Sequence, residues 1–333
     1  MKVTDNSTYR LMQSNLDRIT NELLDLRNQG ATGLKLNKPS DDPGSIRPVM
    51  TTRTQLQHNE RHLETMGFAG DKMAATDSHL EYVENVLVRV KEISINSVNG
   101  AMSQSDLNTL ADEVAELKDQ LLDSANAMID GKYIFAGFKE DTVPFTENSA
   151  YDPALYDVND TTTWPYHYNG DHNRTQLEIT PGEFMEVNLT GNELFMGISN
   201  EIAATGSTDP QQSVTGGIDL FSVLTRVEEA IRANNVSDTS GPGGYIQTQL
   251  NNLEIAADQN RSLRSNLGAK ARRVDIAKLH QQDASIDLQQ ILSRYQDADM
   301  IAIFNDIVQQ ETAFKAALSI TGRVSDISIL EYF

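Results

Sequence analysis

Apolar residues recur every three or four positions near both ends of this chain, and the two stripes share one spacing. The first stripe is Tyr9, Met12, Leu16, Ile19, Leu23 and Leu26, and the second is Met300, Ile303, Ile307, Gln310, Phe314, Ala317, Thr321 and Val324. This spacing puts each set on one face of an α-helix, with the mean step of a coiled-coil seam. One such stripe would leave an ordinary core equally open. Two stripes that can pair favour a rod closed by its own ends, and we predict that their apolar members form an assembly interface.

Size, charge and cysteine content narrow the function classes. The 333 residues allow roughly two domains and a sizeable core, so size alone permits an enzyme. The net charge of −21 with scattered Lys and Arg argues against nucleic acid as a partner, and an anionic membrane would repel the chain as well. The absence of cysteine excludes disulfides, thiolate catalysis and thiolate metal sites.

Neither end of the sequence resembles a membrane or secretion signal. The first residues, Met1 to Thr8, lack the apolar stretch of a cleavable signal peptide, and the apolar run Met300 to Phe304 is too short to span a bilayer. Any export is therefore expected to use another route.

The N-terminal region reads as a helix followed by a loop. We expect the helix from about Ser7 to Gln29, ended by Gly30, because glycine readily adopts the left-handed conformation that terminates helices. Residues 31–44 contain two glycines and two prolines and predict a loop. Asp42 before Pro43 is typical of an N-cap with proline at the first helical position.

The next segments predict long helices. From Pro43 to about Val98 the apolar positions keep helical phase, and a helix of that length would measure about 80 Å, which is rod architecture. Asn99-Gly100 should break it, and Ser103 with Asp106 can form a capping box. A third stripe, ending at Gly131, consists of Leu107, Leu110, Val114, Leu117, Leu121 and Met128.

Residues 138–217 differ in composition from the rest. They hold thirteen carboxylates against Lys139 and Arg174, for a net charge of −11, and five of the nine prolines. Short alternating runs at 164–168, 177–179 and 185–189, bounded by Gly and Pro, predict a small antiparallel β domain with aromatic residues for its own core. Helix is expected again over 218–233 and, after a turn at 241–244, from Tyr245 to the end.

Several motifs together resemble the flagellin superfamily. Residues 37–43, Asn-Lys-Pro-Ser-Asp-Asp-Pro, resemble its N-terminal turn, and Asp297-Ala-Asp-Met leading into the run 309–314 resembles its C-terminal helix. Within the superfamily, the segment 125–138 with Pro144-Phe145, and the apolar ending 329–333, are similar to the branch that joins hook to filament. The resemblance covers roughly 1–140 and 220–333 and says nothing of the insert.

The resemblance implies the following fold: mainly α with a β insert, a long antiparallel helical rod whose coiled-coil terminal helices form an inner layer. The predicted domains are 1–44 with 291–333 (terminal helices), 45–137 with 218–290 (helical rod) and 138–217 (β-rich insert projecting outward). It also implies self-assembly as a short ring in the extracellular flagellum, between a hook-side protein and flagellin. Export would follow the flagellar type III channel, with an export chaperone on the C-terminal helix.

Two groups of polar residues are candidates for metal sites. His58 and His62 lie four apart, but Glu60 does not directly follow the first histidine as a zincin motif requires, so a solvated helix face is the better interpretation. Asp152, Asp157, Asn159 and Asp160 lack the spacing and closing Glu of an EF-hand, which favours an acidic loop. No cofactor, metal or catalytic constellation is therefore expected.

Two other functions stay open. Flagellin itself is the nearest alternative, from which the segment Tyr133 to Phe138 separates this chain. An enzyme or ligand-binding site in the β insert is the remote one, and a ligand or reaction mapped to residues 138–217 would favour it.

Overall fold

A computed structural model describes residues 2–98, 102–180, 182–198, 217–235 and 246–330. The chain is mainly helical with a small β-rich insert, which confirms the predicted fold class. It divides into two compact units, residues 1–61 with 281–333 and residues 62–280, and each is described here by itself. The predicted turns at Asn99-Gly100 and 241–244 lie outside the described residues.

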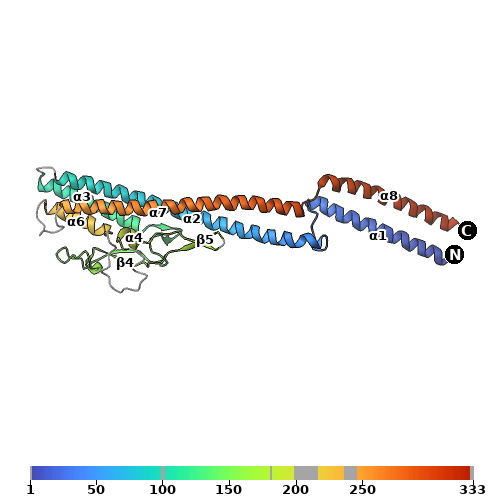
Figure 1. The fold of residues 1–333 in the computed structure, drawn as a ribbon, viewed down its shortest axis with the longest axis horizontal. Helices are drawn as coiled ribbons and strands as arrows, with labels where there is room; N and C mark the ends of the chain where they lie inside the picture. Colours follow the sequence, from blue (N-terminus) through green and yellow to red (C-terminus); the bar gives the residue numbers. More distant parts are fainter. Residues whose placement is uncertain (1, 99–101, 181, 199–216, 236–245, 331–333) are drawn as a thin grey trace. The chain divides into compact units, whose positions relative to one another are not determined.

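The first unit contains α1 (Lys2–Thr32) and α8 (Met300–Leu330), which lie side by side and antiparallel, with both chain ends at the same end of the pair (Figure 1). The prediction that α1 ends at Gly30 is wrong. The helix continues to Thr32 and ends at Gly33, whose φ of 70° is the left-handed conformation that glycine adopts without strain.

The loop between α1 and the next helix is built on two aspartates. Asp41 accepts hydrogen bonds from the backbone N–H groups of Asn37 and Lys38, at 3.0 and 2.8 Å. Asp42 accepts from the N–H groups of Gly44 and Ser45, at 3.0 and 3.3 Å, so the predicted N-cap is confirmed. The Ser45 hydroxyl also donates to Asp42. These hydrogen bonds lower the pKa of Asp42 below its usual value, and the bond from the hydroxyl has the largest effect.

The second unit is built on long helices. α2 (Pro43–Val98) has the predicted bounds, and α7 (Ile246–Gln296) runs beside it (Figure 1). This unit contains α2 from residue 62 and α7 up to residue 280, with α3 (Gln104–Ala125) and α6 (Leu220–Arg232) packed on each other. The predicted capping box at the start of α3 is confirmed, since Ser103 and Asp106 bond reciprocally. The stripe predicted to end at Gly131 stops earlier: α3 ends at Ala125 and Met128 already belongs to a strand.

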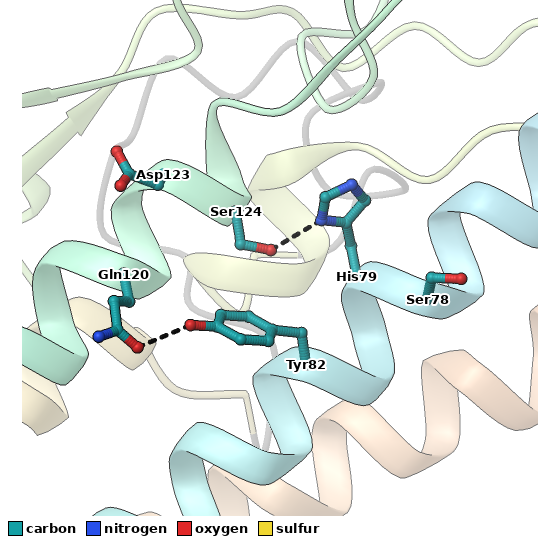
Figure 2. A pocket seen from close by; sticks show the side chains of 6 residues that line it. All are labelled: Ser78, His79, Tyr82, Gln120, Asp123 and Ser124. Atoms are coloured by element: carbon teal, nitrogen blue, oxygen red, sulfur yellow. Dashed lines mark hydrogen bonds between the residues drawn. The ribbon is translucent and has the colours of Figure 1, made fainter.

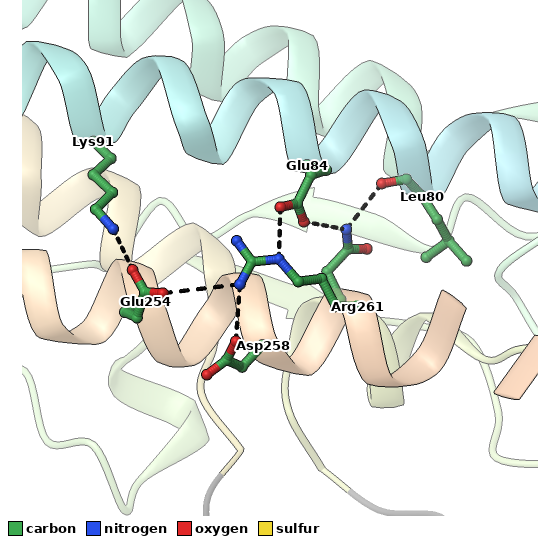
Figure 3. A network of polar contacts seen from close by, with 7 residues as sticks. Leu80, Glu84, Lys91, Glu254, Asp258 and Arg261 are labelled. Carbon is green, nitrogen blue, oxygen red and sulfur yellow. Dashed lines mark hydrogen bonds and ion pairs between the residues drawn. The ribbon is translucent and has the colours of Figure 1, made fainter. Parts of the chain in front are cut away.

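Polar contacts fix the register of α2 against α7 in this unit (Figure 3). Lys91 pairs with Glu254, and the Arg261 guanidinium lies 2.9 Å from Glu84. The buried Asn260 amide donates to the Leu80 carbonyl at 2.9 Å. Sliding either helix along the other would break this bond and leave a buried donor without a partner, which is costly.

The strands form separate two-stranded antiparallel sheets rather than one sheet. Between Met128 and Tyr133 a tight turn with Asp130 and Gly131 at positive φ joins the first pair. The pairs are β1 (Met128–Ile129) with β2 (Lys132–Tyr133), β3 (Phe145–Glu147) with β4 (Tyr166–Tyr168), and β5 (Gln176–Thr180) with β6 (Glu183–Glu186). A short helix, α4 (Gly191–Phe195), and a 3-10 turn, η1 (Thr161–Thr163), were not foreseen.

The aromatic residues of the insert do not form a core of their own. Phe145 and Phe195 pack on Phe221 of α6, with ring centroids 5.3 and 5.7 Å apart, and Tyr166 lies 4.5 Å from the same ring. All belong to one buried cluster with residues of α2, α3 and α7. The insert and the helices of this unit therefore share one core.

Candidate assembly surface

The two predicted stripes face each other across α1 and α8. Leu23 and Ile303 are buried, at 8% and 6% exposure, on an interface where a Cβ at Gly30 would lie 3.5 Å from Ile303. The other stripe residues whose side chains are described are half-buried: Met12, Leu16, Ile19, Leu26, Met300, Ile307, Gln310, Phe314, Ala317 and Thr321. The side chains of Tyr9 and Val324 lie outside the described residues. The structure thus brings the stripes together within one chain.

Polar side chains flank this seam. Arg27 pairs with Glu311 at 2.7 Å, and Gln310 donates to Glu22 at 3.2 Å. Both charged partners are more than a third exposed, so such a pair contributes no more than about 1 kcal/mol. Apolar contact along the stripes, rather than charge, holds the helices together.

Backbone bonds tie the ends of the two helices to each other. The N–H of Ala298 donates to the carbonyl of Gly33 at 2.9 Å, and the N–H of Lys35 donates to the carbonyl of Gln296 at 2.8 Å. Between them, Leu34 and Asp297 form an isolated antiparallel bridge. This short ladder fixes where α1 ends and α8 begins.

A second apolar face of the same helix pair is uncovered. Ile301 is 77% exposed, Val308 63% and Phe304 59%, although large apolar side chains are usually buried in a complete domain. We call the outer face the five exposed apolar residues that each directly follow a stripe residue: Leu24, Ile301, Phe304, Val308 and Leu318. Leu11 and Ile320, which directly precede a stripe residue, lie on the other side of the stripes.

The two predicted stripes do not include the outer face, although the sequence carries a signal for it. Each of its members directly follows a stripe residue, as Leu24 follows Leu23, Phe304 follows Ile303 and Val308 follows Ile307. Adjacent residues lie about 100° apart around a helix, so such apolar pairs predict a second buried face beside the first. A helix that packs on a single partner needs only one apolar face, so the second face indicates a second partner.

A hollow of about 450 Å³ between α2 and α3 is the place where catalysis would be sought (Figure 2). His79 Nδ1 lies 3.0 Å from the Ser124 hydroxyl, and Tyr82 donates to Gln120 at 2.7 Å. Burial lowers the pKa of His79, so its ring is neutral near pH 7. Asp123 points away from His79, and no third group completes a triad among the six residues drawn.

The residues considered for metal binding make local contacts. His58 Nδ1 lies 2.8 Å from an Arg61 guanidinium nitrogen. Asp152, Asp157 and Asp160 each accept an N–H from two residues further along their own loop, the geometry of Asx turns. No group of three or more potential metal ligands occurs within the described ranges.

None of the described helices is both long and apolar enough to cross a membrane.

Comparison with known proteins gives three findings. Residues 3–140 match the bacterial flagellin N-terminal helical region. Flagellar hook-associated protein 3 of Escherichia coli K12 is 25% identical, and that of Salmonella typhimurium LT2 24%, each over 98% of both chains. The crystal structure of hook-associated protein 3 from Legionella pneumophila covers 74% of this chain and 98% of its own, with a TM-score of 0.59 and 19% identity.

These findings confirm the resemblance to the flagellin superfamily and to hook-associated protein 3. They also confirm a structural rather than an enzymatic role, in the bacterial flagellum. At 19% identity the crystal structure supports the fold alone. The part of the stripe residues in assembly stays a prediction.

Proposed function

Since its similarities give this chain a structural role in the bacterial flagellum, we propose that it forms the junction between hook and filament by self-assembly through α1 and α8. The observation that carries this proposal is the outer face. Its five large apolar side chains are 48% to 77% exposed. Covering them would remove apolar surface from water, at about 25 cal/mol per Å².

The two faces of the helix pair have different tasks in this proposal. The stripe residues, including Leu16, Leu23, Ile307 and Phe314, hold α1 to α8 within a chain. The outer face then packs against the terminal helices of neighbouring copies, in an inner layer. The proposed domain limits are residues 44/45, 137/138, 217/218 and 290/291.

The partners follow from this position. A hook-associated protein on the hook side and flagellin on the filament side would each contact one end of the ring. Export would take the flagellar type III route, with a chaperone holding α8. What supports the chaperone is again the exposure of Ile301, Phe304 and Val308, which a chain in transit would need covered.

A substitution on the outer face tests the proposal. Phe304→Asp should leave the monomer folded, because this side chain is already 59% exposed. A charge buried between subunits without a partner costs several kcal/mol, so the junction should fail. Cells carrying the variant should lose swimming and release flagellin into the medium, as seen by motility assay and immunoblot.

Two further variants give this experiment its controls. Leu155→Asp changes an even more exposed side chain, at 71%, in the insert and should swim normally. Phe314→Asp lies on the stripe and should both loosen the helix pair and abolish the junction. Normal swimming by the Phe304→Asp strain would contradict the proposal, whereas filaments that elongate without limit from purified protein would favour flagellin instead.

A further inference from the structure

Three glycines inside long helices surround a groove in the second unit. Gly67 and Gly70 of α2 and Gly268 of α7 line a hollow of about 410 Å³, together with Ala74 and Ala271. Its floor is formed by buried Met66 and Met73. Glycine inside a helix is destabilising relative to alanine, so the presence of glycine at these three positions needs an explanation.

Neither contacts within the chain nor the backbone conformation explains these glycines. A Cβ at Gly67 or Gly70 would meet no atom within 4 Å, and at Gly268 only the end of the Arg272 side chain at 3.9 Å. None of the three has the positive φ that requires glycine. Glycine at such sites is explained when another backbone or side chain comes close from outside the chain.

The rim of the groove carries three aspartates and one lysine, Lys278. Asp71 and Asp275 line it and are exposed. Neither carboxylate forms an ion pair with any residue in the part of the chain that the structure describes. Asp77, also on the rim, is already paired with Arg264 at 2.9 Å. The groove therefore suits an apolar side chain flanked by positive charge.

The first turns of α2 carry a segment of that kind. Residues 43–59 contain Arg47 and Arg53 and no Asp or Glu, in a chain of net charge −21. Met50 lies midway between the two arginines, three residues from each, and is 56% exposed. Steps of three residues put all three side chains along one side of the helix, over about 9 Å. Both arginines are exposed and make no ion pair with described residues.

We propose that the glycine groove of one copy receives Met50 of a second copy, whose Arg53 pairs with Asp71 and whose Arg47 pairs with Asp275. This inference deepens the proposed function, on which it rests, by naming a second self-interface apart from the terminal helices. Met50 with its two arginines and the glycine groove are different surfaces of the chain, so the contact is heterologous. Repetition of such a contact generates a ring or a helix of copies.

Engineered cysteines test the contact directly, because the natural chain has none to interfere. Met50→Cys and Ala74→Cys chains are expressed together in place of the natural protein. Flagella are isolated and oxidised, and covalent dimers are detected by immunoblot under non-reducing conditions. Dimers that join the two variants are expected. A Met50→Cys and Glu116→Cys mixture is the control, since Glu116 is an exposed residue of α3, and should give none.

Filling the groove is the second arm. In Gly70→Leu the new side chain occupies the place of Met50, so the 50–74 dimers and the junction should be lost. Gly70→Ala is its matched control and should keep both, with a monomer melting temperature at or above that of the natural chain. Circular dichroism of both monomers shows that the fold persists.

Charge reversal is the third arm. Asp71→Arg should lose the dimers and the junction, and adding Arg53→Asp to the same chain should restore them. Two results together would overturn this inference and leave the proposed function intact. One is a normal junction in the Gly70→Leu strain. The other is the absence of dimers between Met50→Cys and Ala74→Cys chains that carry no further substitution. Cross-links from the Ala74→Cys chain to flagellin or a hook protein instead of a second copy would also overturn it. Failure of the unmodified protein to form any junction would overturn both.

Discussion

The second unit and the terminal helix pair contain similar apolar side chains but bury them differently. In residues 62–280, Phe145 and Phe221 are 1% and 0% exposed and stack on further rings. In the pair of α1 and α8, Phe304 is 59% and Ile301 77% exposed. The second unit therefore has an aromatic core closed within one chain, although Phe68, Phe138 and Phe184 on its surface are 59% to 62% exposed. The terminal pair has no such core, and in our proposal neighbouring copies complete it.

Truncation of one phenylalanine in each region should separate them most strongly. Phe221→Ala removes a ring that contacts three others in a closed core and should lower the free energy of unfolding by about 3–5 kcal/mol. Phe314→Ala removes a half-buried ring from the terminal seam and should cost the monomer about 1 kcal/mol or less. Urea unfolding followed by circular dichroism measures both.

The m-value serves as the control for this pair, since an unchanged m means that the two variants unfold from comparably folded states. Equal losses of stability in the two variants would mean that the terminal pair is as well packed in the monomer as the second unit. The contrast between the two regions would then be wrong.

The sequence predicted the helical regions better than the insert, for a physical reason. A helix records its buried face locally, so α2 has the predicted bounds and the two terminal stripes do face each other. Where α1 ends depended on a choice between Gly30 and Gly33, and only Gly33 has positive φ. The insert depends on contacts between distant residues, such as Tyr166 with Phe221, which no local period records.

The site shows the same limit. Both stripes were visible, but a stripe does not say whether its partner belongs to the same chain or to another. The outer face was not predicted, because each terminal helix was assigned a single apolar face. The glycine groove was beyond reach, since Gly67 and Gly268 become neighbours only when α2 and α7 lie side by side.

A smaller effect is expected from a buried carboxyl in the second unit. Asp219 is the N-cap of α6, where it accepts from Ser222 N–H at 2.8 Å, and burial raises its pKa to about 7. The folded chain therefore binds a proton there that the unfolded chain has released, between about pH 4 and 7. The free energy of unfolding should fall as pH rises through this range, by at most about 1.4 kcal/mol per pH unit.

Asp219→Asn removes this titration and keeps a good N-cap, so the variant should be more stable relative to the natural chain at pH 8 than at pH 4. Urea unfolding at both values gives the comparison. The terminal pair supplies the contrast, because Phe314→Ala should follow the pH dependence of the natural chain. Parallel pH profiles for Asp219→Asn and the natural chain would mean that this carboxyl is ionised in the fold.

Amide hydrogen exchange, compared between the dilute monomer and isolated flagella, tests the central contrast most directly. α6 should be strongly protected in both, because its core is closed within one chain. α1 and α8, which a single partner covers on one face, should exchange faster in the monomer and gain protection in flagella, most of all over residues 301–320. Equal protection of α8 and α6 in the dilute monomer, unchanged on assembly, would contradict the account.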